Sequence, residues 1–146
     1  LAAAGCEVVA IDYTPAAVAL TQQRLAARGL RAAVVQADVL AWQPAALLAA
    51  VYEQTCLCAL HPDHWIAYAA QLRAWLRPGG QLFALFTQAP RDGGNEGFIV
   101  GPPYHSHVHA MRALFPEPLW DWPKPPYRQV PHATGVCELA AVLTRR

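Results

Sequence analysis

Two aspartates each follow an apolar segment of the chain, and this placement suits nucleotide binding. Asp12 comes directly after the run 7–11, and Asp38 closely follows the segment 31–36. An acid at the carboxyl end of a strand in a doubly wound sheet accepts hydrogen bonds from both ribose hydroxyls, since its two oxygens match a diol. Asp38 is placed to accept from an adenine amino group, with the Val39 N–H offered to a ring nitrogen. The alternatives are a turn or capping acid for Asp12 and a helix N-cap acid for Asp38.

Tyr13 directly follows Asp12, and its ring packs either on the ribose or adenine edge or simply in the core or on the surface. A glycine-rich turn about 20 residues upstream of such an acid holds the other end of the cofactor. Asp12 stands too near Leu1 for that turn to be present. We therefore expect the turn, and the strand before it, to be missing from this chain.

Three histidines alternate along the chain at His105, His107 and His109. His105 and His109 stand four residues apart, which is a known spacing for two metal ligands on one helix face. His107 points away from that face, and no carboxylate stands at the matching step, so we expect no metal site. The alternatives are a helix over a substrate pocket, with His105 near its mouth, and a solvated histidine-rich face.

The residues around these groups predict alternating strands and helices. Thr14 suits a helix N-cap, Pro15 suits the first helical turn, and Gly29 suits the end of the same helix. Consecutive apolar residues, as in 31–36, are typical of a parallel strand buried on both faces. The expected strands are 7–11, 31–36, a segment within 47–52, 81–87 and 136–144, and the expected helices are 15–28, 61–76 and 105–115.

The C-terminal part predicts a change of strand direction. Six prolines in 116–131 exclude long regular structure there, although 119–122 is short enough to pair as an edge strand. This segment lies too close to 136–144 for a helical crossover, so the two form a hairpin and at least one runs antiparallel. The prediction is an α/β fold: a Rossmann-like doubly wound sheet with an antiparallel C-terminal hairpin. The segment 88–104 is expected to be a long loop, either functional or mobile.

The bulk composition narrows the class of protein. The chain has 146 residues, of which 55% are hydrophobic and 14% charged, and this predicts one domain with a buried core. A net charge of +1 suggests neither a nucleic-acid partner nor an anionic membrane surface. No apolar run approaches the ~18 residues that span a bilayer. We expect a cytoplasmic protein with reduced cysteines that is a monomer when full length.

Five segments in order resemble class I S-adenosylmethionine-dependent methyltransferases. They are IDYTP at 11–15, QADV at 36–39, YEQTCLCAL at 52–60, LRPGG at 76–80 and QLFALF at 81–86. The segment YEQTCLCAL and the run 101–104 (GPPY) are more specific and resemble the thiopurine/thiol methyltransferase branch. The resemblance covers nearly the whole chain. The glycine-rich first motif of that family has no counterpart here.

The resemblance implies a fold and a reaction. The family sheet has seven strands in the order 3-2-1-4-5-7-6, with strand seven antiparallel. Residues 1–146 would then be a partial methyltransferase domain that lacks the central first strand and the glycine loop. The implied cofactor is S-adenosyl-L-methionine, and the implied partner is a small-molecule substrate that carries a thiol or a similar soft nucleophile. We expect this chain alone not to bind the cofactor tightly.

The resemblance also assigns site residues. Glu53 would be the catalytic residue and would face the cofactor, where it orients the substrate, steadies the sulfonium charge or accepts a proton; otherwise it is a solvated loop acid. Gln54, Thr55, Tyr104 and His105 would line the substrate pocket. A thiol needs no strong base, because its ordinary pKa is near 8.5.

Two rival functions remain open at this point. A fragment of an NAD(P)-dependent oxidoreductase also uses an acid after the second strand, but the turn at 78–80 and the terminal hairpin argue against it. The second rival is a truncated, non-catalytic Rossmann-like module.

Overall fold

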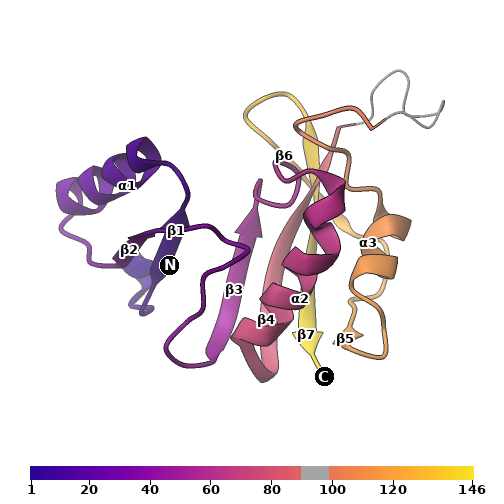
Figure 1. Cartoon of the computed structure of the whole chain (residues 1–146). Helices are drawn as coiled ribbons and strands as arrows, with labels where there is room; N and C mark the ends of the chain where they lie inside the picture. The colour runs from indigo at the N-terminus through magenta and orange to yellow at the C-terminus, as the bar shows by residue number, and fades with distance from the viewer. Residues whose placement is uncertain (90–98) are drawn as a thin grey trace. The chain divides into compact units, whose positions relative to one another are not determined.

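The computed structural model describes residues 1–89 and 99–146, which fall into two compact units (Figure 1). Unit 1 is Leu1–Gln43 and unit 2 is Pro44–Arg146, and each is described by itself. Residues 90–98 of the expected long loop lie outside the described residues. No helix in the described ranges is long and apolar enough to cross a membrane.

Unit 1 contains one helix and a two-stranded parallel sheet. Its elements are the 3-10 helix η1 (Ala2–Ala4), β1 (Val9–Asp12), α1 (Pro15–Ala27) and β2 (Ala33–Gln36). The helix begins as predicted, because Thr14 Oγ1 accepts a hydrogen bond from the Ala17 N–H at 3.3 Å. Gly29 follows the helix with φ 62°, a left-handed conformation that favours glycine.

Unit 2 is built on a mixed sheet in the order β3-β4-β7-β5, with β6 pairing β7 as well. Strand β3 runs parallel to β4, whereas β7 runs antiparallel to β4, β5 and β6. The elements are β3 (Leu48–Gln54), η2 (Pro62–His64), α2 (Trp65–Trp75), β4 (Leu76–Gln88), α3 (Val108–Leu114), β5 (Trp120–Asp121), β6 (Arg128–Pro131) and β7 (Cys137–Arg145).

The mixed α/β architecture confirms the predicted fold class, including the edge strand within 119–122 and its antiparallel partner. Within each unit the strand order agrees with that of the family sheet. The short strand β6 was not predicted, since a segment with six prolines gave no strand signal. Its proline lies at the last position, Pro131, where the strand ends.

Several predicted boundaries were wrong, including the three described next. Strand β3 continues through Gln54, so Glu53 lies inside the strand rather than in a loop after it. Helix α2 ends at Trp75 and β4 follows at once, because Arg77 precedes a proline and the helical conformation is disfavoured there. Helix α3 begins at Val108, so His105 precedes it.

The core of unit 2 lies between the sheet and its two helices. The ring centroid of Phe86 on β4 lies 5.9 Å from that of Phe115, which follows α3. The apolar residues that are at most 1% exposed lie in or beside the helices and strands of unit 2: Leu72, Leu76, Leu82, Met111, Phe115, Trp120 and Leu143. Side chains on the opposite face of the sheet are more exposed to solvent: Tyr52 is 53%, Phe83 39% and Val142 40% exposed.

Candidate functional site

Glu53 is a buried carboxylate near the carboxyl end of β3. Its side chain is 4% exposed, and its Oε1 accepts a hydrogen bond from the Leu57 N–H at 2.8 Å. Burial raises the pKa of Glu53 to about 7; the backbone N–H groups of Leu57 and Cys56 oppose this shift, and the charge of Glu138 adds to it. The alternative of a solvated loop acid is therefore wrong. Near neutral pH such a group can both take up and release a proton.

Gln54 and Tyr52 join a second buried acid that sequence reasoning missed. The Gln54 Nε2 donates to Glu138 Oε2 at 2.9 Å, and the Tyr52 hydroxyl donates to Gln54 Oε1 at 2.7 Å. Glu138 is 0% exposed and stands on β7. The sequence held one signal for it, since Glu138 is a lone acid within the apolar run 136–144. An acid in such a strand is almost never fully buried unless it has a partner, so a partner could have been sought.

Thr55 turns the chain sharply at the end of β3. It has φ 62°, which is unusual for a residue other than glycine, and its hydroxyl donates to the Gln54 carbonyl at 2.7 Å. The Cys58 thiol then donates to the Thr55 carbonyl at 3.4 Å. This turn brings the Leu57 N–H back to Glu53.

Tyr104 and His105 are anchored to the same end of the sheet. The Tyr104 N–H donates to the Cys58 carbonyl at 2.7 Å, and the Tyr104 ring meets that of His61 edge-on at 5.5 Å. His105 Nδ1 accepts from the Ala89 N–H at 3.1 Å, just beyond β4. Burial, together with the neighbouring His107, lowers the pKa of His105, so its neutral form is favoured. (Neutral imidazole both donates and accepts.)

The structure therefore places the five predicted catalytic and substrate-pocket residues at one end of the sheet of unit 2, where the side chains of Glu53 and Gln54 leave β3 on opposite faces. The carboxyl ends of β3 and β4 position all five, directly or through the loops that follow. They are Glu53, Gln54, Thr55, Tyr104 and His105. Ligands in open α/β sheets bind at this end of the strands.

In unit 1, Asp12 closes the turn between β1 and α1. Its Oδ1 accepts from the Thr14 N–H at 2.8 Å and from the Thr14 hydroxyl at 2.9 Å. The turn-acid reading is thus correct for one oxygen, while Oδ2 makes no hydrogen bond within the described part of the chain. Tyr13 is 74% exposed and so is not a core aromatic. Asp38 Oδ1 likewise accepts from the Leu40 N–H at 2.9 Å, beside Val39.

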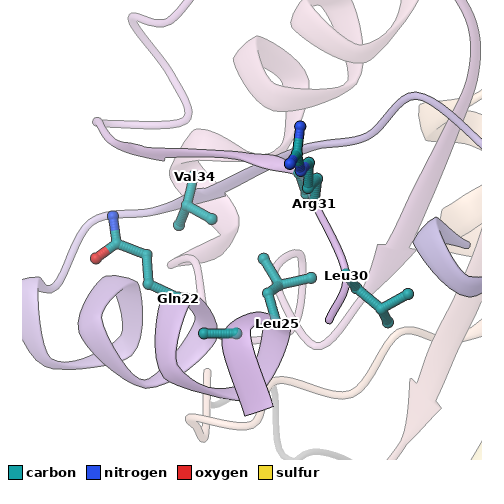
Figure 2. A pocket seen from close by; sticks show the side chains of 7 residues that line it. Gln22, Leu25, Leu30, Arg31 and Val34 are labelled. Carbon is teal, nitrogen blue, oxygen red and sulfur yellow. The ribbon is translucent and has the colours of Figure 1, made fainter. Parts of the chain in front are cut away.

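A pocket in unit 1 lies between α1 and β2, away from these acids. Figure 2 shows Leu25 and Val34 facing it from the helix and the strand. Its lining consists of Gln22, Leu25, Ala26, Leu30, Arg31, Ala32 and Val34. Neither Asp12 nor Asp38 contributes to it, so it is not the predicted nucleoside site.

The histidines do not share a helical face as the spacing suggested. His105 precedes α3, and His107 caps that helix by accepting from the His109 N–H at 3.3 Å. The predicted i, i+4 pair is therefore wrong. Within the described ranges, no group of three or more histidine, cysteine, aspartate or glutamate side chains is placed to hold a metal ion.

Comparison with protein families gives one match. A family model described as a methyltransferase domain matches residues 1–80, which is more than half of the chain. The chain belongs to this methyltransferase domain family. A search of curated proteins gave no match.

Solved structures share the fold of this methyltransferase-family chain. A methyltransferase from Methanosarcina mazei, described as S-adenosylmethionine-dependent, has a TM-score of 0.80 at 13% identity over 99% of this chain and 84% of its own. The Burkholderia thailandensis 1,6-didemethyltoxoflavin-N1-methyltransferase, solved with 1,6-didemethyltoxoflavin and S-adenosylhomocysteine, has a TM-score of 0.68 at 20% identity, over 97% and 62%.

A third structure comes from work on the conversion of a disulfide bond into a thioacetal group during echinomycin biosynthesis. It has a TM-score of 0.68 at 22% identity, over 99% of this chain and 67% of its own. This chain spans 62% of the length of the Burkholderia thailandensis structure and 51% of the length of TehB from Haemophilus influenzae, another structure of similar fold. At these identities the similarity establishes the Rossmann-like methyltransferase fold.

Proposed function

We propose that this protein transfers a methyl group from S-adenosyl-L-methionine to a small molecule that carries a thiol or a similarly soft nucleophile. The observation that carries the proposal is the buried Glu53, with a pKa of about 7, near the carboxyl end of β3. Family membership supports the reaction class and disfavours an NAD(P)-dependent oxidoreductase. A non-catalytic module gives no reason to bury this acid.

The residues of unit 1 fit the nucleoside part of the cofactor. Asp12 Oδ2 is open to accept from a ribose hydroxyl, while the bonds from Thr14 to Oδ1 hold the carboxylate in one orientation. The exposed Tyr13 ring offers an apolar face to the ribose or adenine. Asp38 and Val39 would receive the adenine edge. When bound, the cofactor supplies an activated methyl group on a sulfonium.

The residues of unit 2 fit the methyl acceptor. The bound cofactor would supply its methyl group to the nucleophile, and the sulfonium–methyl bond that breaks would leave its electron pair on sulfur. A neutral thiol must also lose its proton, and an ionised Glu53 is placed to accept it. Gln54, Thr55, Tyr104 and His105 would orient the acceptor. Orientation is the main requirement, contributing about 7–11 kcal/mol in favourable cases.

Sulfur is the preferred acceptor class for two reasons. The segment 52–60 resembles the thiopurine/thiol methyltransferase branch. In addition, one structure of similar fold comes from work on the conversion of a disulfide bond into a thioacetal group. A ring nitrogen is the second candidate, since another protein of this fold is named as an N1-methyltransferase.

The test is a methyl-transfer assay with the protein in the length that its gene encodes, against panels of thiols and of nitrogen heterocycles. At pH 7, Glu53→Gln should lower kcat for a thiol with the ordinary pKa near 8.5 by about 30-fold, because only about 3% of that thiol is ionised without a base. Glu117→Gln is the matched control, because that side chain is 64% exposed and pairs with Arg112. Absence of both cofactor binding and turnover in the wild-type protein would refute the proposal.

A further inference from the structure

Glu138 is a fully buried carboxylate to which the proposed function gives no role. It stands on β7 opposite Thr87 of β4, and its side chain is 0% exposed. Its Oε2 accepts from Gln54 Nε2, and its Oε1 has no hydrogen-bond partner among the described residues. Burying a carboxylate with unused acceptor capacity is costly, so its presence among apolar strands calls for a functional reason.

The hydrogen bonds that start at Glu138 have a fixed direction. An ionised carboxylate only accepts hydrogen bonds, so it holds the Nε2 end of the Gln54 amide toward itself. The Oε1 end of Gln54 then faces Tyr52 and accepts from its hydroxyl at 2.7 Å. The single hydroxyl proton of Tyr52 is used in this bond, which leaves the Tyr52 oxygen as an acceptor only.

The outer end of this chain of hydrogen bonds is open to a ligand. Tyr52 and Gln54 lie two residues apart on β3, so their side chains are on the same face of the sheet. Exposure falls along the chain, from 53% at Tyr52 to 0% at Glu138. The buried acid therefore acts on the accessible hydroxyl only through the half-buried amide between them.

We propose that Glu138 is a positioning residue that, through Gln54, fixes the Tyr52 hydroxyl as a hydrogen-bond acceptor for an N–H or O–H group of the substrate other than its nucleophile. This inference rests on the proposed function and narrows its substrate class. It selects thiols that carry such a second donor group over thiols that lack one. The contact is a hydrogen bond, and no covalent bond changes in it.

The first test is spectrophotometric titration of the Tyr52 phenol, isolated by subtracting the titration of Tyr52→Phe. Burial chiefly raises the pKa of Tyr52, and the charges of Glu138 and Glu53 add to the shift. Glu138→Gln should lower the pKa of Tyr52 toward the ordinary value, and the control Glu117→Gln should not. An unchanged pKa of Tyr52 in Glu138→Gln overturns the proposal.

A second comparison separates the hydrogen-bond chain from direct charge repulsion. In a Gln54→Leu background the link is broken, so Glu138→Gln should shift the pKa of Tyr52 less than it does in the wild type. A shift of equal size in both backgrounds overturns the proposed route through Gln54.

If Glu138→Gln does not fold, NMR of the Gln54 side-chain amide in the wild type and in Tyr52→Phe replaces it. Protected amide protons in both proteins support orientation by Glu138, and free exchange in both overturns it.

The activity test compares two thiol acceptors, one with a separate N–H or O–H donor and one in which that donor is methylated. Tyr52→Phe and Glu138→Gln should each lower kcat/KM for the thiol with the donor by about fivefold, the value of one ordinary hydrogen bond. The double variant should lose no more than either single one, and transfer to the thiol without the donor should be unaffected. Equal losses for both acceptor types overturn the proposal. If the wild-type protein methylates nothing, the proposed function fails, while the titration still decides the role of Glu138.

Discussion

The raised pKa of Glu53 predicts an unusual dependence of stability on pH. The carboxyl has an ordinary pKa of 4.5 and a folded-state pKa of about 7, and at about 1.4 kcal/mol per unit this difference corresponds to about 3 kcal/mol. Because the pKa is raised in the folded state, that contribution is fully present below pH 4.5 and is lost as pH rises through about 7. Glu53→Gln mimics the protonated acid and can still accept from the Leu57 N–H. The variant should match the wild type at low pH and exceed its stability by about 3 kcal/mol above neutrality.

The assay is urea denaturation of both proteins across a pH series from acid to mildly alkaline. The midpoint of the wild type should fall steadily relative to that of Glu53→Gln between pH 4.5 and about 7 and level off above neutrality, because the unfolded chain loses this proton from pH 4.5 and the folded chain only from about 7. Glu117→Gln, at an exposed position, should follow the wild type throughout. A difference between wild type and Glu53→Gln that stays constant over this range would refute the reasoning, since a purely steric effect has no titration.

Three further predictions concern other parts of the molecule. In the protein at the length that its gene encodes, Asp12→Asn keeps an oxygen for the two bonds from Thr14, so it should leave the thermal midpoint unchanged while weakening S-adenosyl-L-methionine binding about tenfold in calorimetry; equal binding would contradict the role of Asp12. Thr55→Gly should raise the free energy of unfolding by about 1 kcal/mol in urea denaturation, because the residue has φ 62°; a destabilised variant would show that its hydroxyl contributes more than the strain costs. Leu72→Ala, at a position that is 0% exposed, should lower the free energy of unfolding by about 2–5 kcal/mol, and a loss below 1 would mean that the core relaxes into the cavity.

The local parts of the fold could be predicted from the sequence because the signals lie close together along the chain. Thr14, Pro15 and Gly29 mark the two ends of α1 within the helix's own neighbourhood. The consecutive apolar residues within 31–36 correctly indicated a parallel strand, but the expected burial on both faces was wrong, since no residue of β2 is buried. The paired segments 119–122 and 136–144 correctly indicated a reversal of direction.

The site around Glu53 and Gln54 could be predicted only in part, since the hydrogen bonds that hold it together join residues far apart in the sequence. Gln54 and Glu138 are 84 positions apart, and only the register that places Glu138 opposite Thr87 brings them together. The burial of Glu53 likewise depends on the turn at Thr55, whose positive φ has no signal in a threonine. The start of α3 was misplaced because the His107 cap competes with a helical spacing that continues before it.

The position of β7 in its sheet has a consequence for how the protein is made. This strand pairs with β4, β5 and β6, yet it follows all three in the sequence. During synthesis, the edge of β4 that pairs with β7 therefore stays unpaired until residues 137–145 have left the exit tunnel of the ribosome. During that interval an apolar strand edge is open to other chains. Slower translation of the codons for residues 137–145 would lengthen that exposure and should increase the dependence of folding on chaperones.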